Sequence, residues 1–491
     1  MLKRARIQLG RPGPVRTPEI FPALLPALIT VLPAASAPGL CALALCALAL
    51  CVPGAAQALG SAAFPAEPSQ HSHRERPLPD RLPDKPTFPP SFRIPVEPLG
   101  FSAPGAIYLG QRNCMASLDF IDDNRLLFTF RVPGLMHRDA GESETSYSRQ
   151  IRAVVLALPA GTVTAEALWT VHDRVRYLWM LKDGHFLLRD RDGLSQGDAA
   201  LNLKPILRFP GPLLWMEMDP SQQFLVTNSR EPAAAPERPG DVPSPPTAQA
   251  RLSVDGQSRG VPNPGVPDPS LPDMVVRILE RSTGQVMLVS RTRSSVHLPI
   301  NSDGYVESLR GDGQQWLLNL KFFSGGSRVL GRVTSTCSPT YDFIAQRELL
   351  VTACDGLGGS HRLVALSTDG RRLWENETSP QAIWPLLVIS PDGSLLARET
   401  LAVNHAINAY SPLDSDDIKG QLVRILDAAN GKVALETAAS PALDAGGNVA
   451  ISPSGRRVAV LNAGAIEVFD LPQPPMLPTP PTIPQTIQAA H

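Results

Sequence analysis

The chain lacks the short motifs that mark several common active sites. Its 491 residues contain no H-E-x-x-H motif, no C-x-x-C pair and no two adjacent cysteines. These absences exclude zincin-type, thioredoxin-like and paired-cysteine chemistry. The chain also lacks an excess of either charge, because 45 basic and 46 acidic residues give a formal net charge of −1. A balanced charge leaves no electrostatic footprint for nucleic acid. We therefore expect no nucleic-acid partner and no cofactor.

Proline and glycine are abundant instead, at 51 and 37 residues. Many turns and few long helices follow from that composition. Three polar, proline-dense stretches cannot bury enough apolar surface to offset the entropy of ordering, and we expect them to be disordered. They are a linker at 59–100, an insert at 231–273 inside the main domain, and a tail at 473–491.

The N-terminus has the order of a secretory signal. Basic residues precede an apolar run, Leu40–Val52, and the small-residue sequence Ala56-Gln57-Ala58 follows it. Thirteen apolar residues are too few to span a bilayer as a helix, which needs about 20. Residues 1–58 are thus expected to be a signal peptide, or an uncleaved anchor if the apolar stretch Ile20–Ala35 extends the run. We expect an extracytoplasmic protein, periplasmic or secreted, that contacts a membrane only through such an anchor.

Residues 101–472 repeat a pattern of a short apolar strand, a tight polar turn and a second apolar strand. The clearest copies are LLVISPDGSLLARE at Leu386–Glu399 and NVAISPSGRRVAVLN at Asn448–Asn462. A second unit, VRILERSTGQVML from Val276 and VRILDAANGKVAL from Val423, recurs 147 residues apart, or three units of 49. Together these units predict four-stranded sheets that repeat every 40 to 60 residues, roughly the length of a propeller blade. The expected fold is all-β, a β-propeller of about seven blades.

Two strings carry a resemblance to known families. ISPDGSLLA at Ile389–Ala397 and AISPSGRRVAVLNAGAIEVFDLP at Ala450–Pro472 resemble the strand-turn-strand repeats of WD40-like and YVTN-like propellers. As a whole the chain is similar to uncharacterised exported bacterial propellers. The Gly-His and Trp-Asp pairs of true WD40 repeats do not recur. The resemblance implies the fold and little about activity, because propellers host many functions.

No catalytic or metal-binding residue can be assigned from spacing. Gly256–Gly260 matches the G-x-S-x-G nucleophile elbow, but the proline-rich sequence after it cannot form the helix that the motif requires. The acidic cluster Asp414, Asp416 and Asp417 lacks the glycine and distal glutamate of an EF-hand, which favours a solvated loop.

The remaining candidates are scattered side chains. We interpret the histidines singly as structural and the tryptophans as packing between blades rather than as a sugar-binding ring. The histidines are His137, His172, His185, His297, His361 and His405. The tryptophans are Trp169, Trp179, Trp215, Trp316, Trp374 and Trp384.

The function expected first is therefore a non-enzymatic, monomeric binding or scaffold module for a protein, glycan or envelope partner. The alternative is a metal-dependent hydrolase or lyase with its site at the mouth of the central channel. Ligands on different blades would leave no spacing signal in the sequence. Three or more carboxylate, histidine or asparagine side chains that converge on the axis would favour the alternative.

Two structural expectations concern closure and cross-linking. The last repeat, 448–471, supplies only three strands, so Ala106–Leu109 or a nearby N-terminal strand should complete it. Once a signal is removed, Cys114, Cys337 and Cys354 remain. A hairpin turn at Ala345-Gln346 would set Cys337 and Cys354 opposite each other. A disulfide between them is expected, and it would contribute roughly 3 kcal/mol.

Overall fold

The computed structural model describes residues 81–103, 116–132, 148–172, 176–231, 273–292, 296–355, 360–378, 382–405, 415–443 and 446–472. Met1–Ser72 and His73–His491 are two separate units, and every described residue belongs to the second. Among the described residues, no helix has the length and apolar character needed to cross a membrane. The secretory signal, the tail and most of the linker lie outside the described part and remain predictions.

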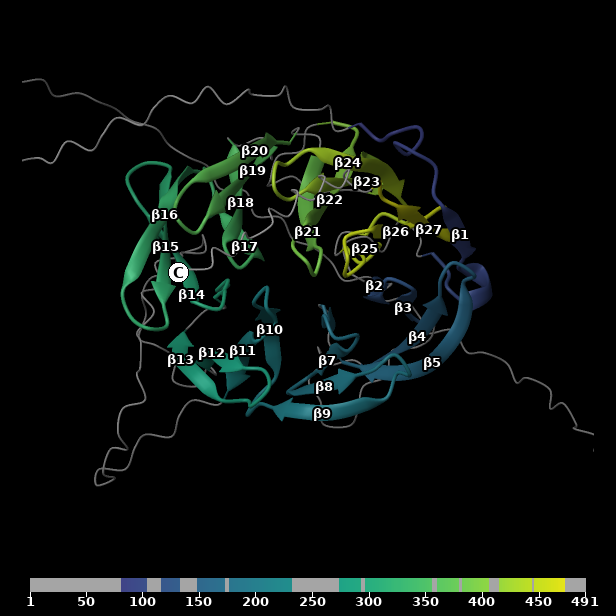
Figure 1. Cartoon of the computed structure of the whole chain (residues 1–491), viewed down its shortest axis with the longest axis horizontal. Coiled ribbons are helices and arrows are strands. Elements are labelled where there is room, and N and C mark those ends of the chain that lie inside the picture. The colour runs from purple at the N-terminus through teal and green to yellow at the C-terminus, as the bar shows by residue number, and fades with distance from the viewer. Residues whose placement is uncertain are drawn as a thin grey trace, which may run out of the picture. The chain divides into compact units, whose positions relative to one another are not determined.

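Apart from two short 3-10 helices, η1 (Glu97–Leu99) and η3 (Ser415–Asp417), the regular structure described is strand. The strands fall into seven sheets arranged as the blades of a ring (Figure 1). The first three blades contain β2 (Ser117–Asp122), β3 (Arg125–Arg131), β4 (Arg149–Ala157), β5 (Thr162–Val171); β6 (Leu178–Met180), β7 (Phe186–Asp190), β8 (Gly193–Gly197), β9 (Leu203–Arg208); and β10 (Leu213–Met218), β11 (Phe224–Glu231), β12 (Asp273–Glu280), β13 (Val286–Thr292).

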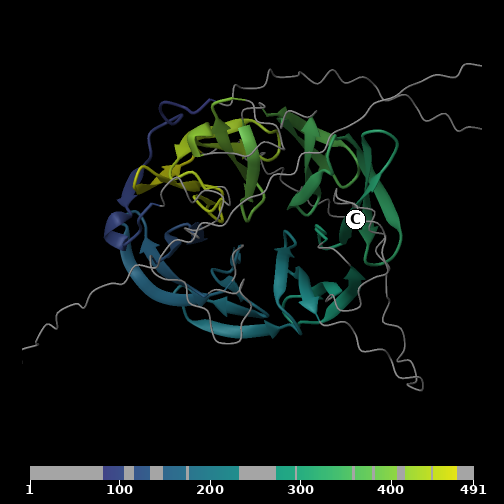
Figure 2. The same cartoon turned by 180° about the vertical axis from the view of Figure 1, so that it is seen from behind.

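The other four blades contain β14 (Gly304–Arg310), β15 (Gln315–Phe322), β16 (Ser327–Thr334); β17 (Thr340–Ala345), β18 (Glu348–Asp355), β19 (Ser360–Ser367), β20 (Arg372–Glu377); β21 (Ala382–Ile389), β22 (Leu395–Val403), β23 (Ile418–Asp427), β24 (Val433–Ala439); and β25 (Val449–Ile451), β26 (Arg457–Asn462), β27 (Ala465–Asp470), β1 (Phe92–Pro95). The expected all-β propeller of about seven blades is confirmed. The first strand of a blade lies toward the ring axis and the last strand lies outside (Figures 1 and 2).

The fourth blade departs from the four-strand pattern. Its sheet has three named strands, and the inner place is taken by 298–300, joined to β14 by a bridge between Ile300 and Tyr305. Val306 N donates to Pro299 O at 3.0 Å. Pro299 has no N–H to donate in return, so a regular ladder cannot form here. The weak repeat of this region in the sequence has that physical cause.

The ring is closed by the N-terminal strand. β1 pairs antiparallel with β27, from Phe92 opposite Val468 to Pro95 opposite Ala465. The completing strand therefore lies upstream of Ala106–Leu109, a stretch outside the described residues, and within the 59–100 segment expected to be linker. That boundary needs correction, because the propeller begins before residue 101. A proline is tolerated in this strand because β1 is an edge strand.

Contacts across the seam reinforce the closure. Leu118 N, in the first blade, donates to Gly447 O before the last blade at 2.8 Å. Ser454 Oγ donates to Asp123 Oδ1 at 2.8 Å. Buried side chains of both blades, including Phe128 and Ile466, form one apolar cluster across the seam.

The S-P-D-G turns explain the most visible repeat. Gly393 has a φ of 75° and its N–H donates to Ser390 O at 2.8 Å, a conformation that favours glycine. The turn after β10 has the same hydrogen bond, from Gln222 N to Asp219 O at 2.8 Å, with Gln222 at a φ of 62°. An Asp219 side-chain oxygen accepts from Phe224 N at 2.7 Å and stabilises this turn without a glycine.

The disulfide between Cys337 and Cys354 is present, with Cα atoms 5.5 Å apart. The expected register was wrong by one residue. Ala345 pairs with Glu348 and Thr340 with Thr352, so the turn comes after Ala345 and the two cysteines are not ladder partners. Instead, Thr336 N donates to Cys354 O at 3.1 Å, which carries Cys337 alongside the end of β18.

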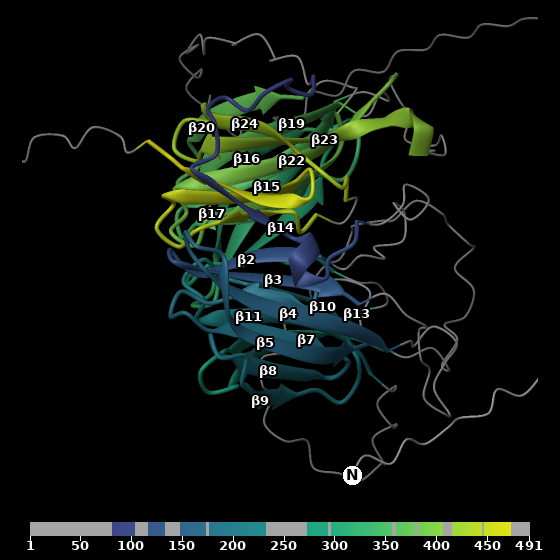
Figure 3. The ribbon, with the colours of Figure 1, turned by 90° about the vertical axis from the view of Figure 1, so that its right-hand side faces the viewer.

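The two ends of the propeller differ (Figure 3). One end holds the connections from the first to the second strand and from the third to the fourth strand of a blade, and each of these connections has two to five residues. We call this end the turn face. The opposite end, the loop face, has the longer ones, such as those between β3 and β4, β11 and β12, and β22 and β23. Glu231 and Asp273 are ladder partners, so the insert leaves and rejoins the third blade at one point of the loop face. The insert itself lies outside the described residues.

Candidate functional site

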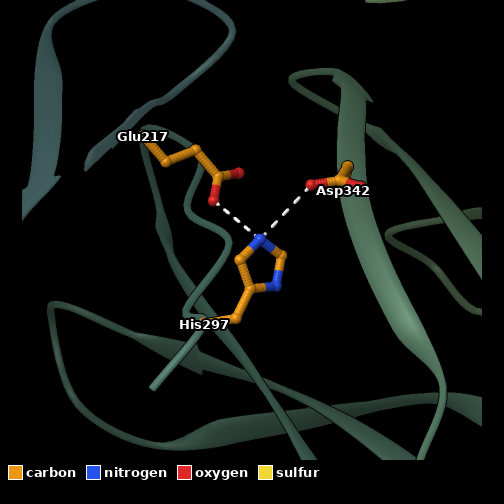
Figure 4. Close-up of side chains that lie close together, drawn as sticks. All are labelled: Glu217, His297 and Asp342. Atoms are coloured by element: carbon orange, nitrogen blue, oxygen red, sulfur yellow. Dashed lines mark ion pairs between the residues drawn. The ribbon is translucent and has the colours of Figure 1, made fainter. Parts of the chain in front are cut away.

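Three ionisable side chains from three consecutive blades meet at one point. His297 Nε2 lies 3.0 Å from Glu217 Oε2 and 3.5 Å from Asp342 Oδ1 (Figure 4). One donor atom from each residue lies within 4.8 Å of the other two. We call Glu217, His297 and Asp342 the axis group. Their side chains are 21%, 38% and 34% exposed, so water reaches all three.

The inner strands bring the axis group together. Glu217 is on β10 and Asp342 is on β17, the first strands of the third and fifth blades. Tyr341 and Phe343 are buried on either side of Asp342, so strand alternation turns Asp342 to the other face. His297 directly precedes the shortened inner segment of the fourth blade. Because that segment is short, the histidine takes the place between the two carboxylates.

Aromatic rings support the imidazole. The Trp215 ring meets the His297 ring edge-on with centroids 5.1 Å apart, and the Tyr341 ring lies at 6.2 Å. Tyr341 is held in turn by a hydrogen bond from its hydroxyl to Ser308 Oγ at 3.3 Å. These contacts restrict the ring so that Nε2 faces both carboxylates.

The electrostatics of the axis group are strongly perturbed. Desolvation lowers the pKa of His297, but the hydrogen bonds and negative charges of Asp342 and Glu217 outweigh it and raise that pKa to about 10. Desolvation also raises the pKa of Glu217, against the effect of His297. Without another cation, His297 is thus a protonated counterion for two carboxylates. Perturbed groups of this kind mark candidate functional sites, although ion-pair networks share the property.

Two more charged side chains lie on the inner side of the ring. Loss of bulk water lowers the pKa of Arg176, while Asp119, Glu217 and Asp342 act in the opposite direction. Arg176 is nevertheless exposed, so water reaches its side chain although protein surrounds it. Asp119, on β2, has its pKa raised to about 6 by desolvation, against a hydrogen bond from Ser117 and the charge of Arg176.

Arg176 leaves the carboxylates of the axis group open. Its Nε donates to Leu178 O at 3.0 Å, and its Cζ lies 5.4 Å from the centroid of the Trp179 ring. Within the described residues it makes no ion pair with Glu217 or Asp342. The Oε2 atom of Glu217 is buried, and it contacts His297 Nε2 at 3.0 Å.

The other described histidines form simpler contacts. His172 lies 3.0 Å from Asp190, His185 lies 3.2 Å from Asp183, and His405 lies 3.8 Å from Asp417. None of these joins a three-donor group among the described residues. Single-residue reasoning therefore missed the site, since it gave His297 no partners and did not single out Glu217 or Asp342.

The remaining sequence candidates do not form a site. Asp416 and Asp417 lie in η3, where their carbonyl groups accept hydrogen bonds from Asn404 at 2.7 and 2.9 Å. Asp414 and Gly256–Gly260 lie outside the described residues. Packing between blades is confirmed for Trp169, Trp179 and Trp374, which belong to apolar clusters that span two blades, and Trp316 is buried.

Comparison with known proteins adds no assignment. No protein-family model matches the chain, and no curated protein matches its sequence. A chain of the Kuenenia stuttgartiensis hydrazine synthase is similar with a TM-score of 0.37 and 11% identity, over 72% of this chain and 94% of that one. TolB from Acinetobacter baumannii is similar with a TM-score of 0.32 and 14% identity, over 66% and 72%. Likenesses this distant assign no activity to the present chain.

Proposed function

We propose that the protein is an exported binding propeller that takes its ligand at the ring axis, from the loop face. The axis group is the observation that carries the proposal. Three ionisable side chains on separate blades are brought within contact distance and kept accessible to water. A simple ion pair needs only two such groups, whereas here one imidazole faces two carboxylates.

The loop face is the side from which a partner would approach. His297 follows the connection from β13, which begins at that end of the propeller, whereas Glu217 is the last but one residue of β10 and lies nearer the turn face. The long connections between second and third strands begin and end there too. Variable loops held on a rigid scaffold are a common place for recognition, so a protein or glycan partner would meet these loops and the axis together.

A capture experiment tests this proposal. The full chain is immobilised and exposed to protein and glycan fractions of its native compartment, beside a His297→Gln variant and a His405→Gln control. His405 is 64% exposed and, among the residues described, contacts one carboxylate. Wild type and control should retain the same ligand and His297→Gln should lose it. Equal retention by all three proteins would rule out the axis as the binding site.

The second candidate is a metal-dependent hydrolase or lyase. The convergence of a histidine and two carboxylates at the axis favours this candidate. Such convergence was the feature expected to distinguish an enzyme of this kind from a scaffold. A metal held by three protein ligands keeps an open position for water or substrate. Turnover of ester, lactone or phosphate substrates that disappears with EDTA and returns with metal would support this candidate. No turnover with any added metal would reject it.

A further inference from the structure

We propose that Glu217, His297 and Asp342 form a binding site for one first-row divalent cation, with Zn²⁺ as the reference ion. The inference rests on the proposed function in one respect, namely that the axis group is where the protein takes a ligand. It goes further by naming the ligand as a cation held by one imidazole nitrogen and two carboxylate oxygens.

The donor set selects the kind of ion. Ca²⁺ and Mg²⁺ prefer oxygen ligands alone, whereas imidazole together with carboxylate suits zinc and its neighbours. Sulfur is absent from the group, which argues against a soft ion. Three protein donors are the usual number where zinc keeps an open position.

The spacing of the donor atoms also fits. Zinc bonds to nitrogen and oxygen ligands of about 2.0 to 2.1 Å in a tetrahedron place neighbouring ligand atoms about 3.3 Å apart. The two distances from His297 Nε2 to Glu217 Oε2 and to Asp342 Oδ1, 3.0 and 3.5 Å, lie on either side of that value. One donor atom of each residue lies within 4.8 Å of the other two, so the three are close enough to share one ion.

The charges around the axis group allow a cation to bind. His297 is one cationic group facing two carboxylates, so the axis group keeps a negative charge that favours a cation. Arg176 is the nearest competing cation in the electrostatic network. Its hydrogen bond to Leu178 and its position against Trp179 keep it out of contact with both carboxylates. Asp119, coupled to Arg176, offsets its positive charge.

The ring contacts act as supports for the ligand. Trp215 and Tyr341 hold the imidazole with Nε2 toward the carboxylates, which is the orientation that a metal-bound histidine needs.

Zinc binding to the full, EDTA-stripped chain tests the inference. Calorimetry with Zn²⁺ and metal analysis should give one ion per chain for wild type and for His405→Gln. Glu217→Gln, His297→Gln and Asp342→Asn should each weaken binding by at least about tenfold. A chain that retains no zinc, or variants that bind as tightly as wild type, would overturn the inference.

X-ray absorption at the zinc edge keeps the test valid if a variant fails to fold. Zinc-loaded wild type should show nitrogen and oxygen ligands at about 2.0 to 2.1 Å, including one imidazole. Sulfur scattering at about 2.3 Å would instead place the ion on a cysteine and overturn the site.

The capture experiment, repeated with EDTA and with Zn²⁺, separates this inference from the proposed function. Loss of the partner in His297→Gln without zinc binding by wild type would leave the proposed function standing and remove the cation. Zinc binding at the axis, together with unchanged capture in the variants, would support the cation site and rule out the proposed function.

Discussion

Gln421 donates a hydrogen bond from Nε2 to Oε2 of Glu399, at 2.9 Å, inside the sixth blade. Glu399 is 0% exposed and Gln421 is 1% exposed. The other carboxyl oxygen of Glu399, Oε1, is buried and accepts no hydrogen bond among the described residues. Gln421 also accepts hydrogen bonds from Leu443 N and from Asn448 Nδ2, so this pair joins the sixth blade to the segment that begins the seventh.

The buried carboxyl makes stability depend on pH. Desolvation raises the pKa of Glu399 from 4.5 to about 8, so the folded chain keeps a proton that the unfolded chain releases near pH 4.5. The stabilisation is full below pH 4.5 and is lost as the pH rises toward 8, by about 1.4 kcal/mol per pH unit. Glu399→Gln removes this ionisation. Its unfolding free energy should match wild type near pH 4.5 and exceed it by a growing margin up to pH 8.

Denaturant unfolding at a series of pH values checks this prediction. Glu166→Gln serves as the control, because the Glu166 side chain is half exposed on β5. A difference between Glu399→Gln and wild type that does not change with pH would contradict the expectation.

The disulfide should stabilise the fifth blade. Cys337 and Cys354 close a loop of 17 residues, and the chain-entropy model gives about 3 kcal/mol for a loop of that size. The double change Cys337→Ser and Cys354→Ser should lower the free energy of unfolding by that order, as should reduction of wild type. Cys114→Ser is the control. An unchanged unfolding midpoint on reduction would show that the bridge contributes nothing.

The closing strand β1 offers a matched pair of positions. Ile94 is 5% exposed and lies against Gly161 of the first blade, whereas Arg93 points away and pairs with Glu467 at 2.9 Å. Ile94→Ala should destabilise the protein by about 2 to 5 kcal/mol and Arg93→Ala by less than about 1 kcal/mol. Thermal unfolding of both variants measures this. Equal, small effects would mean that β1 does not hold the ring closed.

The insert should be the first site of proteolysis. Its two ends, Glu231 and Asp273, are ladder partners, and Arg277 Nη2 donates to Glu231 Oε2 at 2.9 Å beside them. Cleavage in 232–272 should therefore yield two fragments that stay associated through β11 and β12. Brief protease treatment followed by gel filtration and mass spectrometry tests this. First cuts elsewhere in the blades, or fragments that separate, would count against it.

Local turn chemistry made the fold predictable. The turn at Ser390 has glycine at the position of positive φ, so the sequence predicts a hairpin there. The repetition of such turns along the chain predicts the blades. Closure by an N-terminal strand was predicted, but the FRIP sequence of β1 was assigned to the linker because it stands among prolines. An edge strand needs hydrogen bonds on one side only, so nearby prolines do not exclude it.

The axis group was harder to predict because its members are far apart in sequence. A partial signal does exist. Three first-strand copies carry a carboxylate among apolar residues, namely Asp119, Glu217 and Asp342, where the copies at Leu386–Glu399 and Asn448–Asn462 have none. His297 precedes the inner segment of the fourth blade, so it meets the carboxylates of the two flanking blades, Glu217 and Asp342, and not Asp119 of the first blade. Its place at the axis depends on the short inner segment of the fourth blade, which has no regular repeat in the sequence.

The pairing of β1 with β27 also orders the events of synthesis. Phe92–Pro95 is made among the first parts of the propeller, and its partner Ala465–Asp470 among the last. Six blades can form while the chain is still emerging, but both edges of the open ring stay unpaired until residue 470 has emerged. Unpaired strand edges are the surfaces that template aggregation. The final strand is thus the step at which a nascent chain becomes safe from association with its neighbours.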